Sequence, residues 1–143
     1  MRVMLSAVAL LTFSPCVLAN DSADYARMGA NAWKAFECAA LAGELKDSEE
    51  KQRLFSFGYE QGMKFLDAVR SDQVTQRDVF TTVPSEFMNH AEGPNSDFIL
   101  GRVFEVAGRF ALGVTAQGTF DEQRSVAFRK YSDDNCQAIG RER

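Results

Sequence analysis

The sequence is poor in the residues that most enzyme and metal sites require. It contains a single histidine, His90, and three cysteines, of which only Cys38 and Cys136 lie beyond residue 19. The motifs of common nucleotide, hydrolase and zinc sites are also missing: there is no P-loop, GxGxxG, GxSxG, HExxH or CxxC. The two cysteines are too few for a metal cluster. We therefore expect a protein that is not an enzyme and that binds neither a cofactor nor a metal.

Basic sequence is scarce as well. The chain has 16 basic and 20 acidic residues, which gives a formal net charge of −4. No run of lysine and arginine occurs, and basic residues are not interleaved with aromatic ones as in many nucleic-acid-binding chains. The acidic balance also disfavours adsorption to an anionic membrane. These absences argue against nucleic acid as a partner.

No apolar run is long enough to span a bilayer. Residues 1–19 begin with one basic residue, Arg2, continue with the apolar stretch from Val3 to Phe13, and end at the small residue Ala19. This order is typical of a signal peptide cleaved after Ala19. A membrane anchor is the alternative, and the shortness of the apolar run disfavours it. We expect residues 20–143 to form a single domain with no membrane span, in the bacterial periplasm or secreted.

The two remaining cysteines suit an oxidising compartment. An even number of cysteines in a secreted chain predicts a disulfide, here Cys38–Cys136, and a pair of buried free thiols is the alternative. The predicted helix around Cys38 has an apolar stripe that includes Trp33 and Phe36. At 100° per residue, Cys38 lies about 150° from the centre of that stripe. We therefore expect the disulfide to cross the outer flank of this helix.

Helical periodicity dominates the rest of the chain. Apolar residues recur at i, i+3, i+4 and i+7 in four stretches, and no stretch alternates with period two. The predicted long helices span residues 21–43, 48–70, 95–114 and 119–131, and the last should lie on the surface because its apolar content is modest. A short helix over residues 76–83 ends at Pro84, and one last turn is expected around Cys136. The fold class is therefore all-α: a small bundle of four main helices plus a short helix, joined by one disulfide.

Two glycines stand inside the second predicted helix. Gly58 and Gly62 each cost about 1 kcal/mol relative to alanine in a helix interior, so a compensating contact is expected. Close approach of another helix is the simplest compensation. A cavity at this place, lined by phenylalanine rings, would instead suit a small apolar ligand.

The segment from Pro84 to Pro94 has no helical period and is predicted to be a loop. It holds the adjacent apolar pair Phe87 and Met88, of which at least one is expected to be exposed, because adjacent side chains point in different directions. The polar residues around this pair are Glu86, His90 and Glu92. An apolar pair with a polar rim is typical of a protein-binding site, and a loop that caps the bundle is the alternative. His90 with the two glutamates is also a possible metal or base site, although a solvated histidine is commoner.

Three functional hypotheses follow from these patterns. The leading one is a secreted or periplasmic non-enzymatic protein that masks or inhibits a protein partner through residues 86–92, in the manner of immunity proteins and envelope inhibitors. The runner-up is a carrier of a small apolar ligand in a cavity beside Gly58 and Gly62. An enzyme of unknown type is third.

Overall fold

The computed structural model describes residues 20–113 and 118–141. Within these ranges the chain forms six α-helices, a final 3₁₀ turn and no strand. The elements are α1 (Ser22–Glu44), α2 (Ser48–Arg70), α3 (Gln76–Thr82), α4 (Ser85–Asn89), α5 (Ser96–Gly113), α6 (Phe120–Asp133) and the 3₁₀ turn η1 (Cys136–Ala138). The predicted all-α fold, with its four long helices and the short helix before Pro84, is confirmed, and a second short helix, α4, forms after Pro84. The predicted signal peptide and the expected end of the third long helix at Val114 lie outside the described residues.

Local capping determines where the long helices begin. Asp21 caps α1 by accepting the backbone N–H of Asp24 at 2.8 Å, and the Asp24 carboxylate accepts the backbone N–H of Asp21 in return. The same reciprocal pair starts α6, where Thr119 and Glu122 exchange hydrogen bonds. Side chains placed in this way satisfy backbone donors that the first helical turn leaves without partners.

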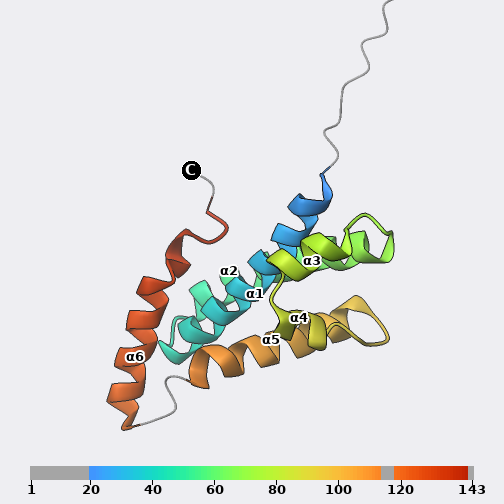
Figure 1. The fold of residues 1–143 in the computed structure, drawn as a ribbon. Coiled ribbons are helices and arrows are strands. Elements are labelled where there is room, and N and C mark those ends of the chain that lie inside the picture. The colour runs from blue at the N-terminus through green and yellow to red at the C-terminus, as the bar shows by residue number, and fades with distance from the viewer. Residues whose placement is uncertain (1–19, 114–117, 142–143) are drawn as a thin grey trace, which may run out of the picture.

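Helix α1 lies at the centre of the molecule (Figure 1). One of its faces packs against α2, α3 and α5, and its buried side chains there include Ala32, Trp33 and Phe36. Its other flank carries Cys38, Leu41 and Ala42, which pack against α6 and η1. Helix α1 is therefore covered on two sides, and two apolar clusters share it.

The Cys38–Cys136 disulfide joins α1 to η1, with 5.6 Å between the two Cα atoms. The pairing is as predicted, but its expected position on an outer flank is wrong. Both cysteines have no exposed surface, because α6 and η1 fold back across that flank of α1. Apolar periodicity identifies only the strongest apolar stripe of a helix. Because α1 is central, it also buries a second stripe, made mostly of small residues, which is weak in the sequence pattern.

Helix α6 lies at one edge of the bundle (Figure 1). It buries only Ala127 and Tyr131, in agreement with its modest apolar content. No helix in the described ranges is long and apolar enough to cross a membrane.

Candidate functional site

The predicted partner-binding residues lie in and after α4, a short helix in a segment that was expected to be a loop. Phe87 has no exposed surface and packs edge-on against Phe65, with ring centroids 5.4 Å apart. Met88 is half-buried against the same apolar cluster. The expectation that at least one of the two side chains would be exposed is therefore wrong, since Phe87 is buried and Met88 is half-buried. The reason is that the Pro84 carbonyl accepts the backbone N–H of Phe87, which winds the segment into a helical turn and points the ring inward.

The polar residues of this segment do not gather around a common point. His90 is half-buried, and its Nδ1 lies 2.9 Å from the backbone oxygen of Glu86. Glu92 is exposed, and its backbone oxygen accepts a hydrogen bond from Arg102. The structure gives His90 a local backbone partner rather than the two carboxylates. No group of three or more His, Cys, Asp and Glu side chains in the described ranges is arranged to hold a metal ion.

Gly58 and Gly62 lie buried in α2 where it meets α1 and α5. A methyl group on Gly58 would lie 2.8 Å from the Phe36 ring, and one on Gly62 would lie 2.5 Å from Leu100 Cδ2. The described neighbouring side chains therefore fill the space beside both glycines and leave no room there for a ligand.

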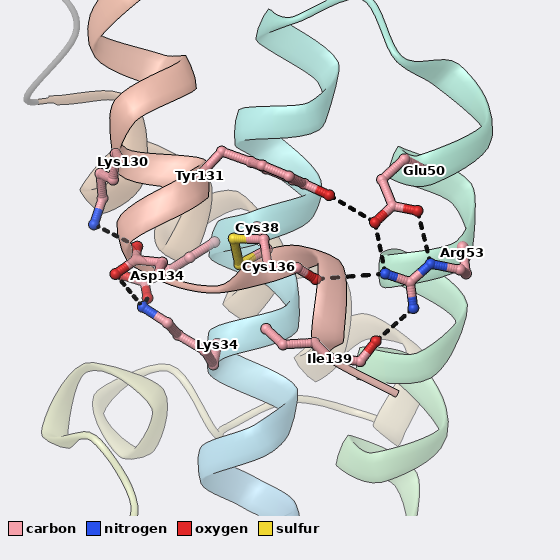
Figure 2. Close-up of a disulfide and its surroundings, with 10 residues drawn as sticks. Lys34, Cys38, Glu50, Arg53, Lys130, Tyr131, Asp134, Cys136 and Ile139 are labelled. Atoms are coloured by element: carbon pink, nitrogen blue, oxygen red, sulfur yellow. Dashed lines mark hydrogen bonds and ion pairs between the residues drawn. A yellow bond between two sulfur atoms is a disulfide. The ribbon is translucent and has the colours of Figure 1, made fainter. Parts of the chain in front are cut away.

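A dense polar network instead forms where α6 and η1 meet α2 (Figure 2). The Glu50 carboxylate accepts hydrogen bonds from Arg53 Nε at 2.7 Å, from Arg53 Nη2 at 2.6 Å and from the Tyr131 hydroxyl at 2.6 Å. Arg141 Nη2 donates to the same carboxylate at 3.1 Å. Arg53 also donates to the backbone oxygens of Cys136 and Ile139. Two residues of α2 therefore hold both α6 and the C-terminal turn.

The network changes the acidity of its members. Hydrogen bonds from Arg53, opposed by partial burial and aided by Tyr131, lower the pKa of Glu50 from 4.5 to about 2. Burial, followed by the adjacent Glu50 carboxylate, raises the pKa of Tyr131. Glu50 is thus ionised and Tyr131 neutral throughout the physiological range, so the pair acts as a fixed structural link and not as a proton donor or acceptor.

A second ionic contact ties α6 to α1. Asp134 lies between Lys34 and Lys130, with a carboxylate oxygen 2.9 Å from each ammonium nitrogen (Figure 2). Burial alone would raise the pKa of Asp134, but hydrogen bonds from the two lysines lower it. Helix α6 is held by this contact, by the Glu50 network and by the disulfide.

A hollow in the described surface lies beside this attachment. It is an open groove of about 1110 Å³ between α6, the α1–α2 turn and the C-terminal segment, which we call the α6 groove. Ala42, Leu45 and Phe128 provide its apolar walls. Arg124 and Arg129 lie at its edge, and Glu50 and Tyr131 lie at the inner side. The groove is amphipathic. Its buried side is formed by Glu50 and Tyr131, which bond to each other, and its exposed side by the Phe128 ring and two guanidinium groups.

Two large aromatic rings of α6 are exposed, Phe128 in the groove and Phe120 at the start of the helix. Phe120 is 58% exposed and Phe128 is 61% exposed, although both are among the most apolar side chains. Arg124 lies between them in the sequence, four residues from each ring. Residues four apart are neighbours on a helix surface, so the arginine lies next to both rings. The Lys46 ammonium group lies 6.0 Å from the centre of the Phe120 ring.

Sequence reasoning did not single out this surface. A signal is present, since Phe120, Arg124 and Phe128 have helical spacing on a helix with little other apolar content. The same spacing is equally consistent with rings buried against the bundle, so the pattern alone does not separate an exposed stripe from a core stripe.

Comparisons with known proteins give no relative that would assign a function. No protein-family model, curated protein or solved structure significantly matches this chain. Function is therefore inferred from the geometry of the described residues.

Proposed function

We propose that this chain is a secreted, non-enzymatic binding protein that masks or inhibits a protein partner, and that it docks through α6. The observation that supports this most directly is the pair of exposed rings, Phe120 and Phe128, on either side of Arg124. Exposed apolar surface with a polar rim is a frequent mark of a protein–protein interface. Aromatic side chains and arginine are also the residues that most often dominate binding energy.

The attachment of α6 suits a docking surface. The hydrogen bond from Tyr131 to Glu50 and the adjacent disulfide hold the C-terminal end of α6, and Phe128 lies one turn before Tyr131 on this anchored helix. A pre-organised surface loses less conformational entropy when a partner binds. This arrangement favours α6 over the predicted residues 86–92, because Phe87 there has no exposed surface.

The proposed compartment is the bacterial periplasm or the exterior of the cell. Disulfides persist in oxidising compartments and are rare in a reducing cytosol, and the Cys38–Cys136 bond supports such a location. The order of residues 1–19 predicts the corresponding export signal.

The carrier hypothesis has less support than the partner hypothesis. Phe36, Ala35 and Leu100 occupy the space beside the two glycines where the ligand was expected. The enzyme hypothesis has no observation in the described ranges that favours it over docking.

Site-specific photo-crosslinking in the cell that produces the protein tests the proposal. A benzophenone side chain replaces Phe128 in one variant and Phe80 in a matched control. Phe80 is an equally large ring on α3 that is 83% exposed and lies outside the α6 groove. We expect position 128 to give a discrete adduct with one protein, and position 80 to give none.

Binding measurements with the purified protein and its crosslinked partner then give the contribution of the Phe128 ring to affinity. Truncation of a central aromatic residue in an interface commonly costs about 2 kcal/mol or more, which is roughly a 30-fold loss of affinity. We expect Phe128→Ser to weaken binding of the crosslinked partner by at least that factor, and Phe80→Ser to leave it unchanged. Equal crosslinking from both positions, or full affinity of Phe128→Ser, would contradict docking through α6.

A further inference from the structure

Helix α6 lies at one edge of the bundle, and one of its sides is exposed (Figure 1). On that side the exposed residues Asp121, Ser125 and Arg129 follow one another at intervals of four residues. Four residues turn a helix by about 400°, so the three side chains form a ridge that drifts by about 40° at each step. The ridge carries an acid at one end, a base about 12 Å farther along the helix axis, and a small residue between them.

The two charges of this ridge are without partners in the described part of the chain. Neither the Asp121 carboxylate nor the Arg129 guanidinium group forms a hydrogen bond or an ion pair with a described residue. They do not pair with each other, because residues eight apart on one helix are separated by about 12 Å along its axis. Pairing of these two charges therefore requires a second molecule.

Two further exposed side chains flank the ridge. Phe128 and Arg124 lie on the same side of it, about 60° and 100° around the helix from Ser125. Phe128 is 61% exposed, and Arg124 has no ion pair within the described ranges. An aromatic face and a guanidinium group attract each other when they meet. The exposed side of α6 therefore carries two kinds of matching group, an acid with a base and a ring with a cation.

A second copy of α6 in the antiparallel direction brings these groups together. A twofold rotation whose axis passes beside Ser125 reverses the ridge, so that Asp121 of each copy lies opposite Arg129 of the other. The same rotation keeps the flanking residues on one side of the helix pair, where Phe128 of each copy lies beside Arg124 of the other. Ridges of residues four apart interlock in the commonest class of helix packing, and the small Ser125 lets the two helices approach at the crossing.

The charge of the surroundings agrees with such a contact. The described lining of the α6 groove contains three acids and three arginines, so it favours neither a strongly acidic nor a strongly basic partner. A surface that is balanced overall, and that has its acid and its base at opposite ends, is complementary to an inverted copy of itself.

We propose that α6 is a self-association surface, through which two copies of the chain form a twofold-symmetric, antiparallel contact centred on Ser125. The inference goes beyond the proposed function and concerns the same face. A dimer of this kind covers Phe128, so a second copy and another protein exclude each other. One helix from each copy buries less than the roughly 1,600 Å² of a standard interface, and we therefore expect a dissociation constant of about 10–100 µM.

Charge exchange tests the proposal. Sedimentation equilibrium of the oxidised chain, over about 5–500 µM, measures the dissociation constant of the dimer. Asp121→Arg places like charges opposite each other at both ends of the contact, as does Arg129→Asp, and each variant should weaken the dimer by at least about 10-fold. An equimolar mixture of the two variants should recover a dissociation constant within about threefold of the parent's, because both end pairs of the mixed dimer are again opposite in charge.

Two controls separate this contact from general effects of charge. Glu60→Arg and Arg77→Asp make the same changes of charge at exposed positions outside α6, and each should dimerise within about threefold of the parent. A mixture of Asp121→Arg with Arg77→Asp has the same total charge as the restoring mixture. It should form no mixed dimer of parental stability, because one end pair still joins two cations.

A cysteine at the twofold axis gives an independent readout that needs no change of charge. Ser125→Cys should form a disulfide-linked dimer with copper–phenanthroline as the oxidant, since the two copies of this residue face each other at the short distance that a disulfide requires. Arg109→Cys, at an exposed position of α5, should crosslink much more slowly. Cys38 and Cys136 do not interfere, because neither has exposed surface.

Three results would overturn the inference. The first is a parent that stays monomeric up to about 500 µM, and the second is a dimer that the Asp121 and Arg129 variants leave unchanged. The third is a pair of single variants that weaken the dimer without recovery in the mixture, together with crosslinking at position 125 that is no faster than at position 109.

Failure of this inference is distinguishable from failure of the proposed function. A monomeric parent that crosslinks to another protein from position 128 keeps the masking function and removes self-association. A dimer whose position 128 crosslinks in the cell only to a second copy keeps self-association and removes the masking function.

Discussion

At the residue scale, the Glu50 carboxylate accepts hydrogen bonds from three side chains, those of Arg53, Tyr131 and Arg141. Its carboxylate joins α2 to α6 through Tyr131 and to the C-terminal segment through Arg141. Its pKa of about 2 lies below the ordinary value of 4.5, so the unfolded chain binds a proton at Glu50 more readily than the folded chain does. The stabilisation is therefore complete above about pH 4.5 and is lost as the pH falls toward 2.

Glu50→Gln should remove this pH dependence. We expect the variant to be less stable than the parent at pH 7, and the difference to shrink by about 1–2 kcal/mol between pH 7 and pH 2.5, after allowance for solvent screening. Urea unfolding at several pH values measures it. Glu60→Gln, at an exposed pair with Lys64, serves as the control and should change stability by less than about 0.5 kcal/mol. The same pH profile in Glu50→Gln and in the parent would show that the network contributes nothing.

At the scale of elements, the contact between α1 and α2 depends on residues without side-chain bulk. Gly58 and Gly62 of α2 allow Phe36 of α1 and Leu100 of α5 to lie directly against the helix backbone. Phe36 then continues the contact outward, packing edge-on against Phe104 with ring centroids 5.4 Å apart. Protein interiors are packed densely enough that one added methyl group here has to displace a neighbour.

Gly62 and Gly101 form a matched pair that tests this packing. Both lie inside helices, but a methyl group on Gly62 would meet Leu100 at 2.5 Å, whereas one on Gly101 would meet nothing within 4 Å. Gly101→Ala should therefore stabilise the protein by about 1 kcal/mol through helix propensity alone. Gly62→Ala should gain less or lose stability, and Gly62→Leu should lose about 1–3 kcal/mol or more. Thermal unfolding of the three variants decides the matter, and a Gly62→Leu protein as stable as the parent would show that the close contact is absent.

At the scale of the whole molecule, the disulfide determines whether α6 belongs to the bundle. It closes a segment with a sequence separation of 98, and α6 buries few side chains of its own. In the chain-entropy description, closure of a loop of this length contributes about 4–5 kcal/mol at most. The α6 groove lies between α6 and the α1–α2 turn, so it exists only while α6 is held in place.

Replacing both cysteines by serine should lower the melting temperature by roughly 10 °C or more and leave most of the helical circular dichroism intact at low temperature. We also expect α6 to become the first site of trypsin cleavage, at Arg124 or Arg129, while α1, α2 and α5 stay protected. Mass spectrometry of the early fragments gives this readout. A variant whose melt and cleavage pattern equal those of the parent would show that the other contacts hold α6 without the disulfide.

The sequence alone determined the features that depend on near neighbours. Helix starts at Asp21, Asp47 and Thr119 were predictable because a cap and its partner lie three residues apart. The disulfide was predictable because only two cysteines remain after residue 19. The all-α class follows from periodicity, which every long helix repeats over several turns.

Which apolar side chains are buried depends on contacts between elements that are distant in the sequence. Phe87 and Phe128 are the same residue type, yet the first has no exposed surface and the second is 61% exposed. The difference arises because Phe87 packs on Phe65 of α2 inside the main apolar cluster, whereas Phe128 lines an open groove. In the same way, Tyr131 reaches Glu50 across 81 positions of the chain, a contact that local patterns do not encode. Burial depends on which distant elements pack against each other. For that reason the exposed rings lie on α6 and not in the Pro84–Pro94 segment.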